Sequence, residues 1–302
     1  MRKPRRLQKG DLVGIAAPCY KVDREKAEAV AAKLSELGFR VKFSDHLCDA
    51  DDGYAASLEK RAADFNALAR DPEVRMILFG GGEVGNELLP YIDYEALRGD
   101  PKFLSSYSDG TTILEAVTSL SGIVTYYGQS PKSFLSGTDF NIAHFKAAMM
   151  DGAPYEFPKE SEWVTIREGV CEGVLTGGYL INFAVMLNGK YYKMPEEDCI
   201  LFVEDLIRFS EPAAVSKWFS HIEQSGLFER VKGLLWGYYD DAPQPLVDDI
   251  LRRIGEKYHI PVVRCADYGH CIRSGLIPIG VRARLDAGSG TLTILEPTVE
   301  EV

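Results

Sequence analysis

The sequence predicts an α/β protein with two domains: a parallel sheet covered by helices on both faces, then a second domain with a mixed sheet. The chain has 302 residues, about twice the length of a typical domain. Apolar runs alternate with amphipathic helical stripes over the first half, which is typical of a parallel sheet. The chain ends in two short segments of alternating polarity, which predict a β-hairpin.

The first half begins with two strand and helix units. Residues 12–17 form a short apolar run, and Asp23 is placed to cap a helix that ends at Gly38. Extended structure resumes at 41–43, and Ser57 is the expected cap of the next helix. Apolar runs at 76–79, 103–104 and 123–127 predict three further strands, with a helix over 110–120 between the last two.

The periodicity lapses between 151 and 168, a polar stretch with two prolines that is typical of an interdomain linker. We therefore expect domains at 1–160 and 161–302. Beyond the linker, strands are expected at 170–175, 200–203, 231–236 and 260–265, with a turn at Gly177-Gly178 and helices near 215–222 and 246–254. Alternation at 281–285 and 292–295 predicts the final hairpin.

Charge and cysteine usage limit the partners and the compartment. The formal net charge is −11, so most of the surface would repel nucleic acid and anionic lipid, although a small anionic substrate is still possible. Six scattered cysteines in a chain of this size predict a reduced, cytoplasmic protein without a disulfide framework. The apolar stretch 12–18 is too short for a signal peptide, and no stretch approaches the roughly 20 residues of a membrane span.

Ser108 lies on a predicted strand-to-helix turn, Ser106-Tyr107-Ser108-Asp109-Gly110. Such a turn exposes a hydroxyl beside the free backbone N–H groups of the helix start, which suits a nucleophile. A serine or aspartate at this position also caps helices, and capping is the commoner role.

Glu204 and His270 also follow apolar runs, where open α/β sheets place their ligands. A carboxylate at the end of a buried strand needs a partner or solvent, and a histidine in a loop after a strand is a candidate general base. Each has an ordinary structural interpretation on its own. Together with Ser108 they occur in the chain order of the α/β-hydrolase triad, Ser, acid, His.

A glycine-rich turn follows the strand at 76–79, and Gly80, Gly82 and Gly85 match Gly-x-Gly-x-x-Gly. This motif is a weak indication of dinucleotide binding. Pro90 leaves little room for a helix after the motif, and the preceding strand is not the first strand of its βαβ series. The alternative is that backbone N–H groups of Gly82 and Asp109 form an oxyanion hole. No zinc motif is present at Cys265, His270 and Cys271 or at His46 and Cys48, so we expect neither metal nor cofactor.

These segments resemble the LD-carboxypeptidase family of serine peptidases, which includes microcin C immunity-type amidases. The resemblance runs from 10–18 to 276–281. Its most specific parts are Gly81-Gly82, Tyr107-Ser108-Asp109, Leu201-Phe202-Val203-Glu204-Asp205 and Asp267-Tyr268-Gly269-His270, together with 86–94, 101–103 and 173–178.

The resemblance implies a Ser108-Glu204-His270 triad, a Rossmann-like doubly wound N-terminal domain, a smaller β-rich C-terminal domain and a homodimer. It implies cleavage of an amide near a free C-terminus. The substrate that we expect is a murein tetrapeptide, cleaved at the L,D bond before D-alanine. The alternatives are an aminoacyl-nucleotide amide of the microcin C type, or a relative that binds a peptide without cleaving it.

The chain departs from the family pattern around the nucleophile and the glycine pair. Ser106 replaces the usual glycine of Gly-Tyr-Ser-Asp, and Gly110 replaces a β-branched residue. Gly80 stands where an arginine or a serine-like residue is common, Glu83 where an aromatic residue or methionine is common, and Gln129 where proline usually follows Tyr-Tyr-Gly.

Overall fold

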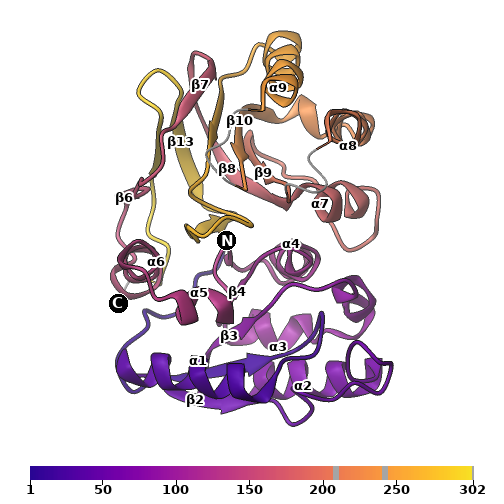
Figure 1. The fold of residues 1–302 in the computed structure, drawn as a ribbon, viewed down its shortest axis with the longest axis vertical. Coiled ribbons are helices and arrows are strands. Elements are labelled where there is room, and N and C mark those ends of the chain that lie inside the picture. The colour runs from indigo at the N-terminus through magenta and orange to yellow at the C-terminus, as the bar shows by residue number, and fades with distance from the viewer. Residues whose placement is uncertain (207–210, 240–243, 301–302) are drawn as a thin grey trace.

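The strands form two sheets, one in each of two lobes. The computed structural model describes residues 1–206, 211–239 and 244–300, and within these residues the sheets have six and eight strands. In Figure 1 the N-terminal lobe, in indigo and magenta, lies below the lobe that holds the orange and yellow segments. The chain is therefore mixed α/β, as the sequence predicts.

The first sheet has the strand order β12-β5-β4-β3-β1-β2. All its pairs are parallel except that between β12 and β5. Its strands are β1 (Leu12–Ala16), β2 (Arg40–Phe43), β3 (Val74–Phe79), β4 (Phe103–Ser106), β5 (Thr125–Tyr127) and β12 (Ile277–Ile279). The accompanying helices are α1 (Arg24–Glu36), α2 (Leu58–Arg70), α3 (Tyr94–Gly99), α4 (Gly110–Ser121), α5 (Pro131–Ser136) and α6 (Asp139–Phe145), with a 3₁₀ helix at Gly85–Tyr91 and a π-helical turn at Lys146–Asp151.

Local sequence explains the first helices. The Asp23 carboxylate accepts a hydrogen bond from the Lys26 N–H at 3.1 Å, which satisfies one of the free N–H groups at the start of α1. The Ser57 hydroxyl caps α2 in the same way. Alanine, valine and leucine side chains at helical spacing bury the inner face of α1. Both predicted caps are confirmed.

The second sheet has the order β6-β14-β13-β8-β9-β10-β11-β7. Its four central strands, β8 to β11, are parallel, and antiparallel strands flank them, so the predicted mixed sheet is confirmed. The strands are β6 (Tyr155–Glu156), β7 (Val164–Arg167), β8 (Val170–Tyr179), β9 (Cys199–Glu204), β10 (Val231–Gly237), β11 (Val262–Cys265), β13 (Arg282–Asp286) and β14 (Thr291–Ile294). Its helices are α7 (Leu180–Met186), α8 (Pro212–Gln224) and α9 (Pro245–Tyr258), with a 3₁₀ turn at Leu227–Glu229.

The structure differs from the sequence-based expectation at two places in this sheet. The predicted turn at Gly177-Gly178 is wrong, because β8 continues through both glycines to Tyr179. A Cβ on Gly177 would lie 1.7 Å from the Phe202 carbonyl oxygen of β9, so the glycines permit close strand contact rather than a turn. Strands β6 and β7 lie inside the aperiodic segment 151–168, and at two and four residues they are too short to show alternation.

Helix α4 connects the two lobes. The Glu115 carboxylate accepts the Gly177 N–H at 2.7 Å, and the Thr111 hydroxyl accepts the Tyr179 N–H at 2.9 Å. Strand β12 adds a second connection, since it follows β11 of the upper sheet in the chain but pairs with β5 of the lower one. Burial raises the pKa of Glu115 to about 8.

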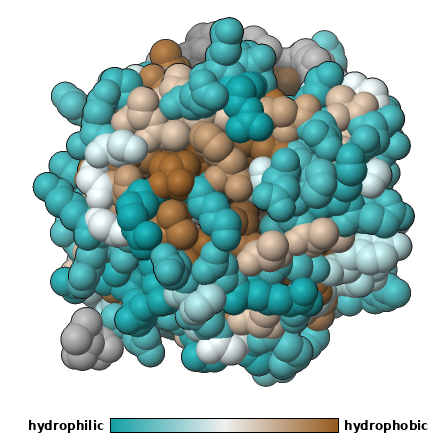
Figure 2. All heavy atoms as spheres, turned by 90° about the horizontal axis from the view of Figure 1, so that it is seen from below, coloured by the Kyte–Doolittle hydropathy of each residue, from teal (hydrophilic) through white to brown (hydrophobic). Residues whose placement is uncertain are grey.

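The face seen from below is mainly hydrophilic, with a hydrophobic area left of its centre (Figure 2). Among the described residues, no helix combines the length and the apolar character needed to cross a membrane.

Candidate active site

Ser108 lies on a strained turn between β4 and α4. Its φ is +56°, in the left-handed region that residues other than glycine rarely adopt. Such strain persists only where the surroundings hold it, and it is common at functional sites. The Ser108 N–H donates to the Tyr127 hydroxyl at 3.1 Å, and the side chain lines a cavity between the lobes. The predicted serine at a strand-to-helix turn is thus present in the structure, where it is half-buried on the wall of this cavity.

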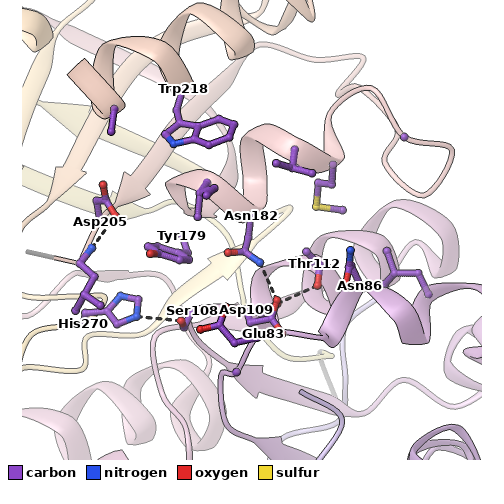
Figure 3. A pocket seen from close by; sticks show the side chains of 18 of the residues that line it. Glu83, Asn86, Ser108, Asp109, Thr112, Tyr179, Asn182, Asp205, Trp218 and His270 are labelled. Carbon is purple, nitrogen blue, oxygen red and sulfur yellow. Dashed lines mark hydrogen bonds between the residues drawn. The ribbon is translucent and has the colours of Figure 1, made fainter. Parts of the chain in front are cut away.

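His270 links Ser108 to Glu204. The Ser108 hydroxyl donates to His270 Nε2 at an Oγ–Nε2 distance of 2.9 Å, as Figure 3 shows. The other ring nitrogen, Nδ1, lies 3.0 and 2.9 Å from the two Glu204 carboxylate oxygens, which fixes the proton on Nδ1. Glu204 is fully buried and His270 is 11% exposed at its side chain. The three residues that the sequence singles out therefore form one hydrogen-bonded line.

The electrostatic environment of His270 suits a base. Burial lowers its pKa, but the adjacent Glu204 carboxylate outweighs this, so the net pKa is raised above the ordinary 6.5. The rings of Tyr107 and Tyr179 flank the imidazole at centroid distances of 5.2 and 4.9 Å. These two aromatic contacts help to fix the orientation of the imidazole.

Tyr127 completes the arrangement, and the sequence analysis did not single it out for this role. Its hydroxyl donates to Glu204 Oε1 while accepting the Ser108 N–H. Burial and the Glu204 charge raise its pKa far above the ordinary 10, so it stays a neutral donor. The result is a closed ring: Ser108 backbone, Tyr127, Glu204, His270 and back to the Ser108 side chain.

The segment that carries His270 crosses from the upper sheet to the lower one. The Ser274 N–H donates to Asn141 at 2.8 Å, and the Leu276 N–H donates to His144 Nδ1 at 3.3 Å. The buried Gln129 amide donates to the Ser274 carbonyl at 3.0 Å and to the Asn141 carbonyl at 2.7 Å. The departure at Gln129 thus helps to fix the segment that carries His270.

The departures at Ser106 and Gly110 compensate each other. A Cβ on Gly110 would lie 2.1 Å from the Ser106 Oγ, so a β-branched residue at 110 would clash with serine at 106. Ser106 is fully buried and its hydroxyl donates toward the Gly80 carbonyl. The side chain that the family pattern has at 110 is absent here, and the side chain of Ser106 takes up space next to it. Ser108 keeps its left-handed conformation.

The glycine-rich turn packs directly against the nucleophile. A Cβ on Gly81 would lie 2.6 Å from the Ser108 Cβ, and one on Gly82 would lie 2.3 Å from the Cys19 carbonyl oxygen. Gly82 and Asp109, whose backbone N–H groups are the expected oxyanion donors, both line the cavity at Ser108. The close approach of Gly81 was not anticipated.

The Asp109 side chain holds the turn and the second lobe together. Its carboxylate accepts the Gly85 N–H at 2.6 Å and the Asn182 amide at 2.7 Å, the latter bond being visible in Figure 3. Burial raises the pKa of Asp109. Because Asp109 occupies the Gly85 N–H and Pro90 lies within the 3₁₀ helix that follows, this turn offers no helix start to a pyrophosphate.

The cavity beside Ser108 has a volume of about 670 Å³, large enough for a short peptide or a nucleoside. Residues from both lobes form its wall: Glu83 and Asn86 from below, and Tyr179, Asn182 and Trp218 from above (Figure 3). Within the described ranges, no three His, Cys, Asp or Glu side chains are grouped as metal ligands, and both His270 ring nitrogens are engaged by Ser108 and Glu204.

Comparison with known proteins agrees with this architecture. Residues 13–128 match the LD-carboxypeptidase N-terminal domain, and residues 172–285 match the C-terminal domain. The putative carboxypeptidase YocD of Bacillus subtilis is 30% identical, over 96% of this chain and 97% of its own. The probable murein peptide carboxypeptidase of the same organism is 28% identical, over 99% and 96%. The crystal structure of an MccF-like protein from Bacillus anthracis superposes with a TM-score of 0.89 at 29% identity, covering 97% of this chain and 99% of that one. With both family domains matched in order over most of its length, the chain belongs to the LD-carboxypeptidase family.

Proposed function

We propose that this protein is a serine hydrolase in which Ser108, His270 and Glu204 form the catalytic triad. The observation that carries the proposal is the continuous hydrogen-bonded line from the Ser108 Oγ through both His270 nitrogens to the buried Glu204. A serine hydroxyl is a weak nucleophile unless a positioned base takes its proton. Here the base lies within hydrogen-bond distance and a buried carboxylate orients it.

The reaction follows from these positions. As the Ser108 Oγ bonds to the amide carbon, its proton moves to His270 Nε2, and Glu204 stabilises the resulting imidazolium. Backbone N–H groups of Gly82 and Asp109 are the proposed donors to the oxyanion. The proton then passes to the leaving amine as the carbon–nitrogen bond breaks. Water, deprotonated by the same histidine, hydrolyses the acyl-enzyme and releases the acid.

The proposed substrate is a murein tetrapeptide, cleaved at the L,D bond before its terminal D-alanine. Similarity to a probable murein peptide carboxypeptidase supports this choice. The second candidate is an aminoacyl-nucleotide amide of the microcin C type, which the likeness to an MccF-like protein favours. The homodimer and the cytoplasmic location that the family resemblance implies stay predictions.

Incubation with each substrate in turn, followed by mass spectrometry of the products, tests the proposal. Release of D-alanine supports the carboxypeptidase, and release of an amino acid with the free nucleotide supports the amidase. If neither product forms while either ligand raises the melting temperature, the chain is a binding protein that has lost catalysis, and the proposal is wrong.

A further inference from the structure

A second cavity opens on Ser108 from the side of α1 and α5. Its volume is about 1020 Å³, and it shares Gly82, Glu83 and Ser108 with the first cavity. The nucleophile therefore stands where two cavities meet. A substrate whose scissile amide lies at Ser108 would extend into both.

The two cavities differ in charge. Four basic residues line the second cavity against the acidic Asp23 and Glu83: Lys21, Arg24, Lys26 and Lys132. Among the described residues, the first cavity is lined by four carboxyl groups and by no lysine or arginine; the acids are Glu83, Asp109, Asp205 and Glu211. Among the described residues, basic side chains near Ser108 are therefore gathered on the side of α1 and α5, which favours an anionic group of the substrate there.

Of the four basic residues that line this cavity, Lys132 alone also lines a cavity with His270. That cavity has a volume of about 350 Å³ and includes Gly269, and the positive charge of Lys132 acts to lower the pKa of His270. By contrast, Lys21 contacts the Gly53 carbonyl, and Arg24 lies over the Phe43 ring at 5.6 Å. Lys132 takes part in none of the ion pairs found within the described ranges, and it is exposed at the second position of α5.

The position of Lys132 matches a requirement of the proposed reaction. The leaving nitrogen receives its proton from His270, and in an α-amino acid the carboxylate carbon lies only about 2.5 Å from that nitrogen. A group that recognises this carboxylate must therefore lie beside His270 and carry positive charge.

We propose that Lys132 binds the free carboxylate of the leaving amino acid and so makes the enzyme a carboxypeptidase rather than a general amidase. This assignment rests on the proposed function. A charge-assisted hydrogen bond from an ammonium to a carboxylate is lost when either partner becomes neutral. Removing the charge of Lys132 or that of the substrate carboxylate should therefore lower kcat/KM by a similar factor. Removing both charges should lower it little further.

The experiment measures kcat/KM of wild type, Lys132→Met, Lys132→Arg and Lys26→Met on a murein tetrapeptide and on the same peptide with a C-terminal amide. Lys26→Met is the matched control, because Lys26 lines the same cavity and is also exposed. We expect Lys132→Met to lose about tenfold or more on the free acid, mainly through KM, and less than threefold on the amide. Lys132→Arg should keep most of the preference. Lys26→Met should lose less than threefold on the free acid, because it weakens the general attraction of the cavity for anions without removing a direct contact to the carboxylate.

The outcomes separate this assignment from the proposed function. Equal losses on both peptides, or no loss on the free acid, would overturn the role of Lys132 and leave the proposed triad untouched. A wild-type protein that releases neither D-alanine nor D-alaninamide would overturn the proposed murein peptide substrate and this assignment with it.

Discussion

Tyr127→Phe removes one oxygen atom and tests whether the closed ring around Ser108 matters for turnover. The Ser108 N–H loses its acceptor at 3.1 Å, and the fully buried Glu204 carboxylate loses a donor. A buried group left without its partner costs about 1–3 kcal/mol. Part of that cost is expected in the transition state, where Glu204 must hold the imidazolium. At 1.36 kcal/mol for each factor of ten, kcat should fall about 10- to 100-fold, with KM changed by less than about threefold.

Tyr126→Phe is the matched control. Tyr126 precedes Tyr127 on β5 and is equally buried, but its hydroxyl donates to the Thr298 carbonyl, away from the three residues of the proposed triad. Both variants should lose a comparable amount of stability in urea denaturation, whereas only Tyr127→Phe should lose kcat in the D-alanine release assay. Equal kcat for the two variants would refute the idea that Tyr127 positions the triad.

Three further predictions concern the residues around the site. Glu204→Gln removes the carboxylate charge, while burial still disfavours the imidazolium form of His270. NMR titration should therefore find the His270 pKa below that of wild type. An unchanged pKa would contradict the electrostatic account. Gly110→Val should lower stability by about 1–3 kcal/mol, because its Cβ meets the Ser106 hydroxyl. Adding Ser106→Gly should restore most of that loss, and an additive double variant would disprove the compensation. Gln129→Leu removes two buried hydrogen bonds, one to the Ser274 carbonyl of the segment that carries His270 and one to the Asn141 carbonyl of α6. It should lower both the melting temperature and kcat; full activity would show that the segment does not need these bonds.

The candidate site could be read from the sequence largely because of sheet geometry. Glu204 ends β9, and Ser108 and His270 lie in loops that follow β4 and β11, so apolar runs followed by polar residues mark all three. Tyr127 gave no such signal, since a tyrosine inside an apolar strand is ordinary core.

The parts of the fold that the sequence left unpredicted depend on long-range contacts. Strand β12 has three residues, and only its pairing with β5 shows that the chain returns to the first sheet. The Gly177-Gly178 pair is indistinguishable from a turn until the backbone of β9 is seen against it. The steric dependence between positions 106 and 110 likewise could not be predicted, because it arises only from the strained turn that brings these residues into contact.

The central claim is that Ser108 is the nucleophile, and the most direct test is the rate of D-alanine release by Ser108→Ala. The side chain loses a single oxygen on the cavity wall, so the melting temperature should stay close to that of wild type. Turnover should fall on the order of 10⁴-fold or more, because the acyl-enzyme can no longer form. A folded Ser108→Ala protein that keeps near wild-type turnover would contradict the account.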